Sequence, residues 1–242
     1  KNAIQMTQAW IRDGLHERAI TSDLKWGIPV PKAGYEDKVF YGWFDAPIGY
    51  ISIAANLAAE RGEDWKSFVD YWWKSPEQVE LFQFIGKDNI PFHTVIFPSS
   101  LLGTGENWTM LHHMSSSEYL NYEGGKFSKS KGIGVFGSDA MESGIAADLW
   151  RFYIYYNRPE KSDGQFVWKD FQEKVNGQLI GNLGNLVNRV LTFVHRYYDS
   201  HIPPLPQDAK AAPWQDDIEK LIAKTGALLE RAELREAFKT VF

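Results

Sequence analysis

Short apolar runs alternate with helix-like segments through the first half of the chain, and this alternation is what most restricts its fold. Residues 39–44 form an apolar run with the length of a buried strand, and a helix over residues 47–61, ended by Gly62, is expected after it. A second apolar run at residues 81–85 is followed by a helix over residues 90–102. Strands that alternate with helices indicate an α/β fold with a doubly wound parallel sheet.

Polar side chains gather just after each of the expected strands. They occupy residues 45–50, residues 87–93 and a lysine-rich loop at residues 126–131, which follows a third expected strand near residues 119–122. The carboxyl ends of parallel strands meet at one edge of a sheet, where such folds bind their ligands. The ammonium and hydroxyl groups of the loop suit a polyphosphate. The sequence therefore predicts one ligand site with a phosphate-binding loop.

The last third of the chain changes to a helical period of 3.6 residues. One apolar stripe consists of Phe171, Val175, Leu179, Leu183, Val187, Val190 and Val194. The proline-rich segment 203–206 ends that helix, and a second helix is expected from about Pro213. Its inward-facing residues are expected to be Ile218, Leu221, Ile222, Leu229 and Ala232. Two helices cannot bury both stripes, so the sequence predicts the first part of a larger helical bundle.

The composition excludes several classes of protein. The chain has no cysteine and hence no disulfide, thiolate metal site or cysteine nucleophile, as is usual in a reducing compartment. The net charge of −5 argues against nucleic-acid binding through bulk charge, so any RNA contact must use a local basic patch. No segment approaches the about 18 consecutive apolar residues of a membrane span, and the first residues lack the apolar core of a signal peptide. We expect a cytoplasmic protein without membrane contact.

Residues 132–137 spell Gly-x-Gly-x-x-Gly, a pattern also found in dinucleotide-binding folds. That use requires a strand before the first glycine and an unbroken helix after the third. Here the lysine-rich loop precedes the pattern, and Gly144 interrupts the segment that follows it. We therefore reject a nicotinamide cofactor.

The lysine-rich loop contains Lys-Phe-Ser-Lys-Ser at residues 126–130, which resembles the KMSKS loop of class I aminoacyl-tRNA synthetases with Phe in place of Met. Two further segments, Trp-Phe-Asp-Ala-Pro-Ile-Gly-Tyr at residues 43–50 and Lys-Asp-Asn-Ile-Pro-Phe-His at residues 87–93, narrow the resemblance. With them, nearly the whole chain resembles the methionyl-tRNA synthetase family, especially its cytosolic eukaryotic-like form.

The resemblance implies the C-terminal half of a class I Rossmann catalytic domain followed by an α-helical anticodon-binding bundle. Residues 1–125 would form the C-terminal part of the catalytic domain with the end of its inserted connective domain. Residues 126–170 would form the lysine-rich loop and a region that contacts the tRNA stem. Residues 171–242 would form the first part of the anticodon-binding bundle.

The resemblance also implies an activity and the residues that serve it. The family activates L-methionine with ATP, taken as its Mg²⁺ complex, to methionyl-adenylate and transfers the methionyl group to tRNA(Met). The implied catalytic residues are Asp88, Lys126 and Lys129. The implied methionine-binding residues are Trp43, Ala46, Pro47, Tyr50, Asn89 and His93. The implied ATP-binding residues are Gly86, Lys87, Asp88, Lys126, Ser128, Lys129 and Ser130, and no protein-bound metal is expected.

The chemistry of methionine fits these residues. Its side chain is unbranched and polarisable, so an aromatic pocket with one or two polar groups suits the thioether. The Tyr50 hydroxyl and a His93 nitrogen can both meet the sulfur, whereas leucine would leave them unpaired. Ordinary structural roles are the alternatives: a core residue for Trp43, a structural histidine for His93 and a helix N-cap for Asp88.

Asn185 and Arg189 are the anticodon-binding residues that the resemblance implies. They are four positions apart and therefore project from one helix face. Amide and guanidinium groups can hydrogen-bond to splayed single-stranded bases and stack on them. An exposed polar pair of this kind is otherwise ordinary on a solvated helix.

The chain departs from the family pattern in several places. It has no His-x-Gly-His motif and no cysteine-bearing zinc knuckle, and Ser22 stands where the resemblance leads us to expect Arg before Asp23. We therefore expect a segment of a larger enzyme, with the N-terminal half of the same enzyme as the partner that completes the ATP site. The alternatives are a non-catalytic methionine- and RNA-binding fragment or paralogue, and a class I synthetase for another aliphatic amino acid.

Overall fold

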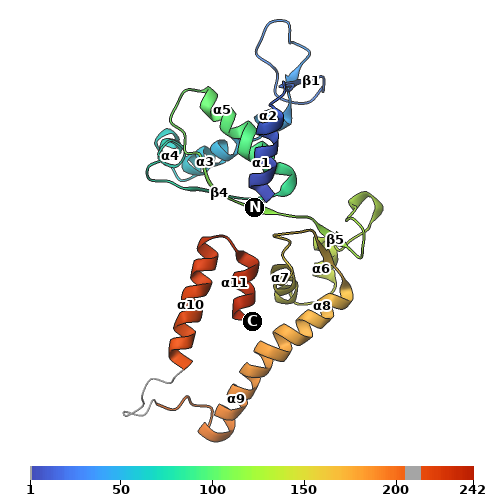
Figure 1. The fold of residues 1–242 in the computed structure, drawn as a ribbon, viewed down its shortest axis with the longest axis vertical. Helices are drawn as coiled ribbons and strands as arrows, with labels where there is room; N and C mark the ends of the chain where they lie inside the picture. Colours follow the sequence, from blue (N-terminus) through green and yellow to red (C-terminus); the bar gives the residue numbers. More distant parts are fainter. Residues whose placement is uncertain (1, 205–213) are drawn as a thin grey trace. The chain divides into compact units, whose positions relative to one another are not determined.

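The structure, a computed structural model, describes residues 2–204 and 214–242 (Figure 1). The chain folds as two compact units, Lys1–Ser116 and Ser117–Phe242, which we treat one at a time. Among the helices of the described residues, none combines the length and the apolar character needed to cross a membrane.

The first unit is mainly helical, with short strands between its helices. Its elements are α1 (Asn2–Asp13), β1 (Thr21–Ser22), β2 (Val39–Phe40), α2 (Gly42–Asp45), α3 (Ile48–Glu60), α4 (Trp65–Trp73), β3 (Leu81–Gly86), the 3₁₀ turn η1 (Lys87–Asn89), the π-helical turn η2 (Phe92–Ile96), α5 (Phe97–Gly103) and β4 (Leu111–Ser117). Helices α3, α4 and α5 surround its core, which is centred on Val69, Trp73, Phe97 and Leu101. The predicted helices near residues 47–61 and 90–102 and the strand at residues 81–85 are confirmed.

The end of α3 shows why the helix stops where the sequence predicts. Gly62 has φ +70°, a conformation that costs glycine little. Its N–H donates to the carbonyl of Ala59 at 3.0 Å, and the N–H of Glu63 donates to the carbonyl of Ala58 at 2.9 Å. These two bonds form a Schellman motif, which satisfies carbonyl groups that the helix leaves free. At the start of α4, Asp64 accepts a hydrogen bond from the backbone N–H of Ser67 at 3.0 Å.

The predicted strand over residues 39–44 is mostly wrong. Only Val39 and Phe40 are extended, and they pair with β1 in the antiparallel direction, whereas α2 begins at Gly42. Short apolar runs fit a strand or a helix equally well, so periodicity could not decide between them. The exposure of Trp43, 59%, also excludes a buried strand. Trp43 lies in α2, which is separated from α3 by Ala46 and Pro47.

The predicted doubly wound sheet is not formed by the residues that the structure describes. Their named strands pair as three two-stranded sheets, β1–β2, β3–β4 and β5–β6. Parallel pairing is confirmed for β5 (Leu120–Tyr122) with β6 (Gly164–Phe166). Strand β4 could not be predicted because Leu-His-His-Met-Ser-Ser-Ser has neither an apolar run nor a clear alternation. Strand β6 could not be predicted because three residues are too few for a periodic signal.

The second unit packs its helices around an aromatic core. Besides β5 and β6 it contains the 3₁₀ turn η3 (Lys129–Lys131), α6 (Gly137–Glu142), α7 (Ala147–Tyr156), α8 (Trp168–Lys174), the π-helical segment η4 (Val175–Gly184), α9 (Asn185–Tyr198), α10 (Trp214–Glu230) and α11 (Leu234–Val241). The core consists of Trp150, Phe152, Tyr153, Phe166, Phe171 and Val175. Tyr153 is 1% exposed, and its hydroxyl donates to Asp170 Oδ2 at 2.8 Å, which ties α7 to α8.

Segments α8, η4 and α9 form one continuous helical rod (Figure 1), as the 3.6-residue period predicts. The apolar stripe is buried at Phe171 and Val175, but Val187 and Val190 are 46% and 51% exposed. The second predicted helix is present as α10, although Pro213 lies outside the described residues, as does Pro206.

The predicted inward stripe of α10 is largely exposed within the described residues. Its exposed members are Ile218, Leu221, Ile222 and Leu229. Ala232, which follows α10, is buried, and so is Leu228 near the C-terminal end of the helix. Helix α11, which the sequence analysis did not predict, forms a helical hairpin with α10. A periodic stripe shows which face of a helix is apolar, but only a packing partner can bury that face.

Candidate active site

A buried, hydrogen-bonded histidine joins two of the predicted amino-acid-binding residues of the first unit. His93, in η2, is 4% exposed, and its Nδ1 lies 2.9 Å from the carbonyl oxygen of Asn89. Its Nε2 lies 2.8 Å from the hydroxyl of Tyr50, in α3. A carbonyl oxygen can only accept, so Nδ1 donates to it and Nε2 accepts the Tyr50 proton. The ring is therefore fixed at both nitrogens. Neither His93 nor Tyr50 lines the cavity that contains Trp43, and Tyr50 lines a separate cavity of about 260 Å³ beside Trp73 and β3.

Aromatic rings continue from this pair to Trp43. The rings of Phe92 and His93 are 5.4 Å apart, and those of Trp43 and Phe92 meet edge to face at 5.8 Å. Such contacts hold large side chains in defined orientations. Trp43 and Phe92 also line a cavity of about 340 Å³, together with Asp88 and Asn89. This volume lies at the lower end of the range typical of small-ligand sites.

Two further residues of the predicted amino-acid pocket lie between α2 and α3. Ala46, an exposed residue, follows α2, and Pro47 is buried at the start of α3. Neither lines the cavity beside Trp43. Their positions fix the turn between Trp43 and Tyr50, so their role here is to set the backbone.

The predicted nucleotide-binding residues near the end of β3 lie in one tight turn. Gly86 is the last residue of β3, and Lys87, Asp88 and Asn89 form η1. Gly86 occupies the N-cap position of this turn, so the alternative role of Asp88 as the helix N-cap is wrong. The π-helical turn η2 follows directly. Turns of this kind are frequent at functional sites, and this one contains His93.

The lysine-rich loop of the second unit begins from a tight hairpin turn. The backbones of Tyr122 and Gly125 exchange two hydrogen bonds of 2.8 Å, and Glu123 and Gly124 between them have φ of 45° and 82°. Two positive φ angles define a type I′ turn. The carboxylate of Glu123 accepts from the N–H of Trp168 at 2.9 Å, which ties the turn to the start of α8.

The loop itself is closed at its base. Ser128 and Ile133 exchange backbone hydrogen bonds of 2.8 and 3.0 Å, and η3 lies between them. Phe127 packs against the core of the unit, and its ring lies over Gly134, where a Cβ would come within 2.3 Å of Cδ1. The side chain that replaces Met in the KMSKS pattern is thus the anchor of the loop. With the loop anchored in this way, the side chains of Lys126 and Lys129 remain on the surface.

Most of the cationic and hydroxyl residues that the sequence predicts for phosphate binding are exposed. Lys126 and Lys129 are exposed, as is Ser130, while Ser128 is half-buried. The hydroxyls of Ser128 and Ser130 lie 3.4 Å apart. Two ammonium groups and two hydroxyls on one closed loop form a suitable binding surface for a polyphosphate.

The predicted RNA-contacting pair lies on α9. Asn185 and Arg189 are both exposed, in the first two turns of that helix. Within residues 2–204 and 214–242, no three His, Asp or Glu side chains are placed to hold a metal ion.

Of the residues that line the cavity beside Trp43, the sequence predicted only Trp43, Asp88 and Asn89 as site residues. Trp10, in α1, and Arg18, between α1 and β1, line the cavity beside Trp43 and Asp88. Both come from a segment whose pattern predicts only a helix and a polar connection. No local signal in the sequence indicates that this segment reaches the site.

Comparison with known proteins assigns the chain to a protein family. Residues 1–191 match the family described as tRNA synthetases class I (M). The chain belongs to this family of class I aminoacyl-tRNA synthetases.

The chain is also similar to individual enzymes within this family. The chain is 63% identical to the methionine–tRNA ligase of Treponema denticola and 52% identical to the cytoplasmic methionine–tRNA ligase of Arabidopsis thaliana. These matches cover 100% and 99% of the chain but only 31% and 30% of the two relatives. The chain thus spans about a third of the length of these relatives.

The fold is also shared with solved structures. Methionyl-tRNA synthetase of Mycobacterium tuberculosis bound by methionyl-adenylate matches with a TM-score of 0.78 at 22% identity. The match covers 99% of this chain and 44% of that protein. The chain therefore has the fold of the corresponding part of a class I synthetase.

Proposed function

We propose that this chain supplies the amino-acid pocket and the phosphate-binding loop of an enzyme that activates L-methionine with ATP and transfers it to tRNA(Met). The observation that carries this proposal is the pair formed by Tyr50 and His93, whose polar atoms meet at 2.8 Å beside a row of aromatic rings. Membership of the class I family and the identity to methionine–tRNA ligases support it.

The pocket distinguishes methionine through its polar atoms as well as its shape. Because the His93 ring is bonded at both nitrogens, it orients the Tyr50 hydroxyl, whose oxygen remains able to contact a thioether. The Trp43 ring offers the apolar and polarisable surface that sulfur prefers. A leucine side chain matches the apolar bulk but makes no polar contact, so it would bind less well.

The first chemical step is an in-line displacement at phosphorus. A carboxylate oxygen of methionine attacks the α-phosphorus of Mg²⁺-bound ATP, and the bond from that phosphorus to the bridging oxygen breaks. Pyrophosphate leaves with the bonding electron pair. Positioning and charge stabilisation dominate such steps. Lys126 and Lys129 are the cations that would meet the leaving pyrophosphate, and Asp88 is the carboxylate that would meet the α-ammonium group.

Two further parts of the proposal concern regions beyond this site. The relatives are about three times as long as the chain, and we propose that an N-terminal half of the same enzyme completes the ATP site. The exposed pair Asn185 and Arg189 on α9 is suited to contact anticodon bases, and the helical rod would then belong to an anticodon-binding bundle. The Arabidopsis relative is cytoplasmic, which supports the same location for this chain.

The test is methionine-dependent ATP–pyrophosphate exchange by the full-length protein that contains this chain. Lys129→Ala is expected to lower the exchange rate by about a hundredfold, equivalent to about 3 kcal/mol of transition-state stabilisation. Lys169→Ala, at an exposed lysine of the same unit whose side chain is 83% exposed, is the matched control and should keep the rate. Exchange that survives Lys129→Ala would count strongly against the proposal.

Competition separates the alternatives. Exchange stimulated equally by leucine, isoleucine or valine would indicate a synthetase for another aliphatic amino acid. Methionine binding without any adenylate formation would indicate a non-catalytic protein.

A further inference from the structure

Arg18 lies where two cavities of the first unit meet. It belongs to the segment between α1 and β1, and its guanidinium lies 5.3 Å from the centre of the Trp10 ring. A guanidinium over an indole face is held by a cation–π attraction, which restricts its orientation. Arg18, Trp10, Phe44 and Ile96 line both the 340 Å³ cavity beside Trp43 and a larger one of about 810 Å³.

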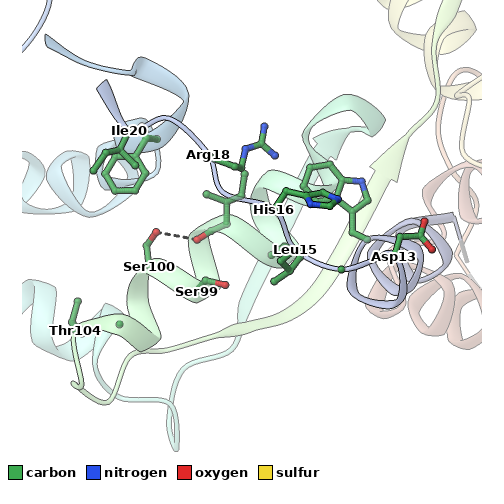
Figure 2. A pocket seen from close by; sticks show the side chains of 14 residues that line it. Asp13, Leu15, His16, Arg18, Ile20, Ser99, Ser100 and Thr104 are labelled. Carbon is green, nitrogen blue, oxygen red and sulfur yellow. Dashed lines mark hydrogen bonds between the residues drawn. The ribbon is translucent and has the colours of Figure 1, made fainter. Parts of the chain in front are cut away.

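Figure 2 shows the walls of the larger cavity. Leu15, His16 and Arg18 come from the connecting segment, and Ser99 and Ser100 come from α5 on the other side. Trp10, Phe44 and Ile96 form an apolar part of its wall. Arg18 is therefore a cation that lies between the larger cavity and the smaller cavity next to Trp43.

The smaller cavity carries one charge of each sign. Among the described residues that line it, Arg18 is the one cation and Asp88 is the one anion. The other lining residues are mainly aromatic or aliphatic, including Trp43 and Phe92. A free amino acid has the matching pattern, with an ammonium group, a carboxylate and a side chain on one carbon atom. Cavities lined by apolar groups use a few polar groups to set the orientation of their ligand.

We propose that Arg18 binds the α-carboxylate of the amino-acid substrate. Its planar group can donate two parallel hydrogen bonds to a carboxylate, which fixes direction as well as distance. Held in this way, the carboxylate keeps its remaining lone pairs for attack on phosphorus. This inference rests on the proposed function, because it names a contact of the same substrate. Tyr50 and His93 do not line the smaller cavity, and the rings of Trp43 and Phe92 connect that cavity to His93.

The experiment compares two ligands that differ at one group. L-Methionine has the α-carboxylate, and L-methioninol replaces it with an uncharged CH₂OH group. Binding of each to the full-length protein is measured by isothermal titration calorimetry without ATP. Arg18→Met keeps an unbranched apolar stem against Trp10 and removes the charge. It is expected to weaken methionine binding by about tenfold to a hundredfold and to leave methioninol binding within about twofold.

Two further variants complete the design. Arg61→Met, at an exposed arginine that follows α3 in the same unit and lines neither cavity, should change neither affinity. Arg18→Gln retains a donor and most of the length, and it should show the same selective loss. It decides the question if Arg18→Met does not fold.

The possible outcomes are distinct. A loss confined to methionine supports the contact. Equal losses for both ligands, or none, would overturn it while the proposed function stands. A wild-type protein that binds neither ligand would overturn the proposed function and this inference together.

Discussion

The hydroxyl of Tyr50 lies 2.8 Å from Nε2 of His93, and the opposite ring nitrogen lies 2.9 Å from the carbonyl oxygen of Asn89. The contact joins α3 to the π-helical turn η2, so a bond between two side chains also connects two backbone elements. It makes the geometry of the proposed amino-acid pocket depend on the packing of the whole first unit. Mutations can therefore affect stability and ligand binding at the same site.

Tyr50→Phe removes the donor that His93 Nε2 accepts. Because His93 is 4% exposed, its nitrogen would lose its partner in a buried position, which costs about 1–3 kcal/mol. We expect a lower free energy of unfolding and a higher KM for methionine, with the KM for ATP nearly unchanged. Chemical denaturation and pyrophosphate exchange measure these quantities. Tyr71→Phe, at a 51% exposed tyrosine of α4, should change none of them, and an unaltered methionine KM in Tyr50→Phe would contradict the role of the pair.

Gly134→Ala tests the anchor of the lysine-rich loop. The residue has φ +138°, and a Cβ there would come within 2.3 Å of the Phe127 ring, so Phe127 must move. We expect the loop to open, with faster tryptic cleavage after Lys126 and Lys129 and a higher KM for ATP. Gly137→Ala is the matched control, because a Cβ at that position meets no atom within 4 Å. Equal cleavage rates in the two variants would show that the anchor does not hold the loop.

The Tyr153 hydroxyl should make stability depend on alkaline pH. Burial and the hydrogen bond to Asp170 raise the pKa of Tyr153 from 10.0 to about 12. The protonated form is thus favoured in the folded protein. Its contribution is fully present below pH 10, the pKa of the unfolded chain, and is lost as pH rises toward 12. The loss is on the order of 2 kcal/mol.

The measurement is urea unfolding of wild type and Tyr153→Phe between pH 9 and pH 12. Other groups titrate in this range, so the difference between the two proteins carries the test. The wild type should be more stable below pH 10, and the difference should shrink as pH rises. A constant difference would contradict the assignment. Tyr197→Phe, at a 60% exposed tyrosine, is the control and should follow the wild type.

Changing Asn185 and Arg189 should separate RNA binding from amino-acid activation. The double change Asn185→Ala with Arg189→Ala removes the polar groups proposed to meet anticodon bases. We expect the KM for tRNA(Met) in aminoacylation to rise about tenfold or more, because each contact to an unpaired base contributes on the order of 1–3 kcal/mol. Methionine-dependent pyrophosphate exchange should stay at the wild-type rate. A matched change at Arg151, an exposed residue of α7, should alter neither reaction.

Local signals in the sequence were sufficient for some elements. The helix 48–60 and its end at Gly62 follow from a proline, an apolar segment and a glycine, which act within a few residues. The long helical rod follows from its period. Signals of this range were insufficient for residues 39–44, where the same apolar composition fits a strand or a turn of helix. Tertiary packing around residues 39–44 selects a short strand followed by α2.

The sequence by itself determined the chemistry that is available: a lysine-rich loop with Phe in the place of Met, a tyrosine and a histidine within two characteristic segments, and the absence of cysteine. Only the tertiary structure decided that the Tyr50 hydroxyl meets His93, that Phe127 anchors the loop and that Arg18 shares a cavity with Asp88. The physical reason is the short range of local sequence signals. Propensity, capping and periodicity act over one or two turns of chain, whereas a binding cavity is formed by packing between segments that are distant in sequence.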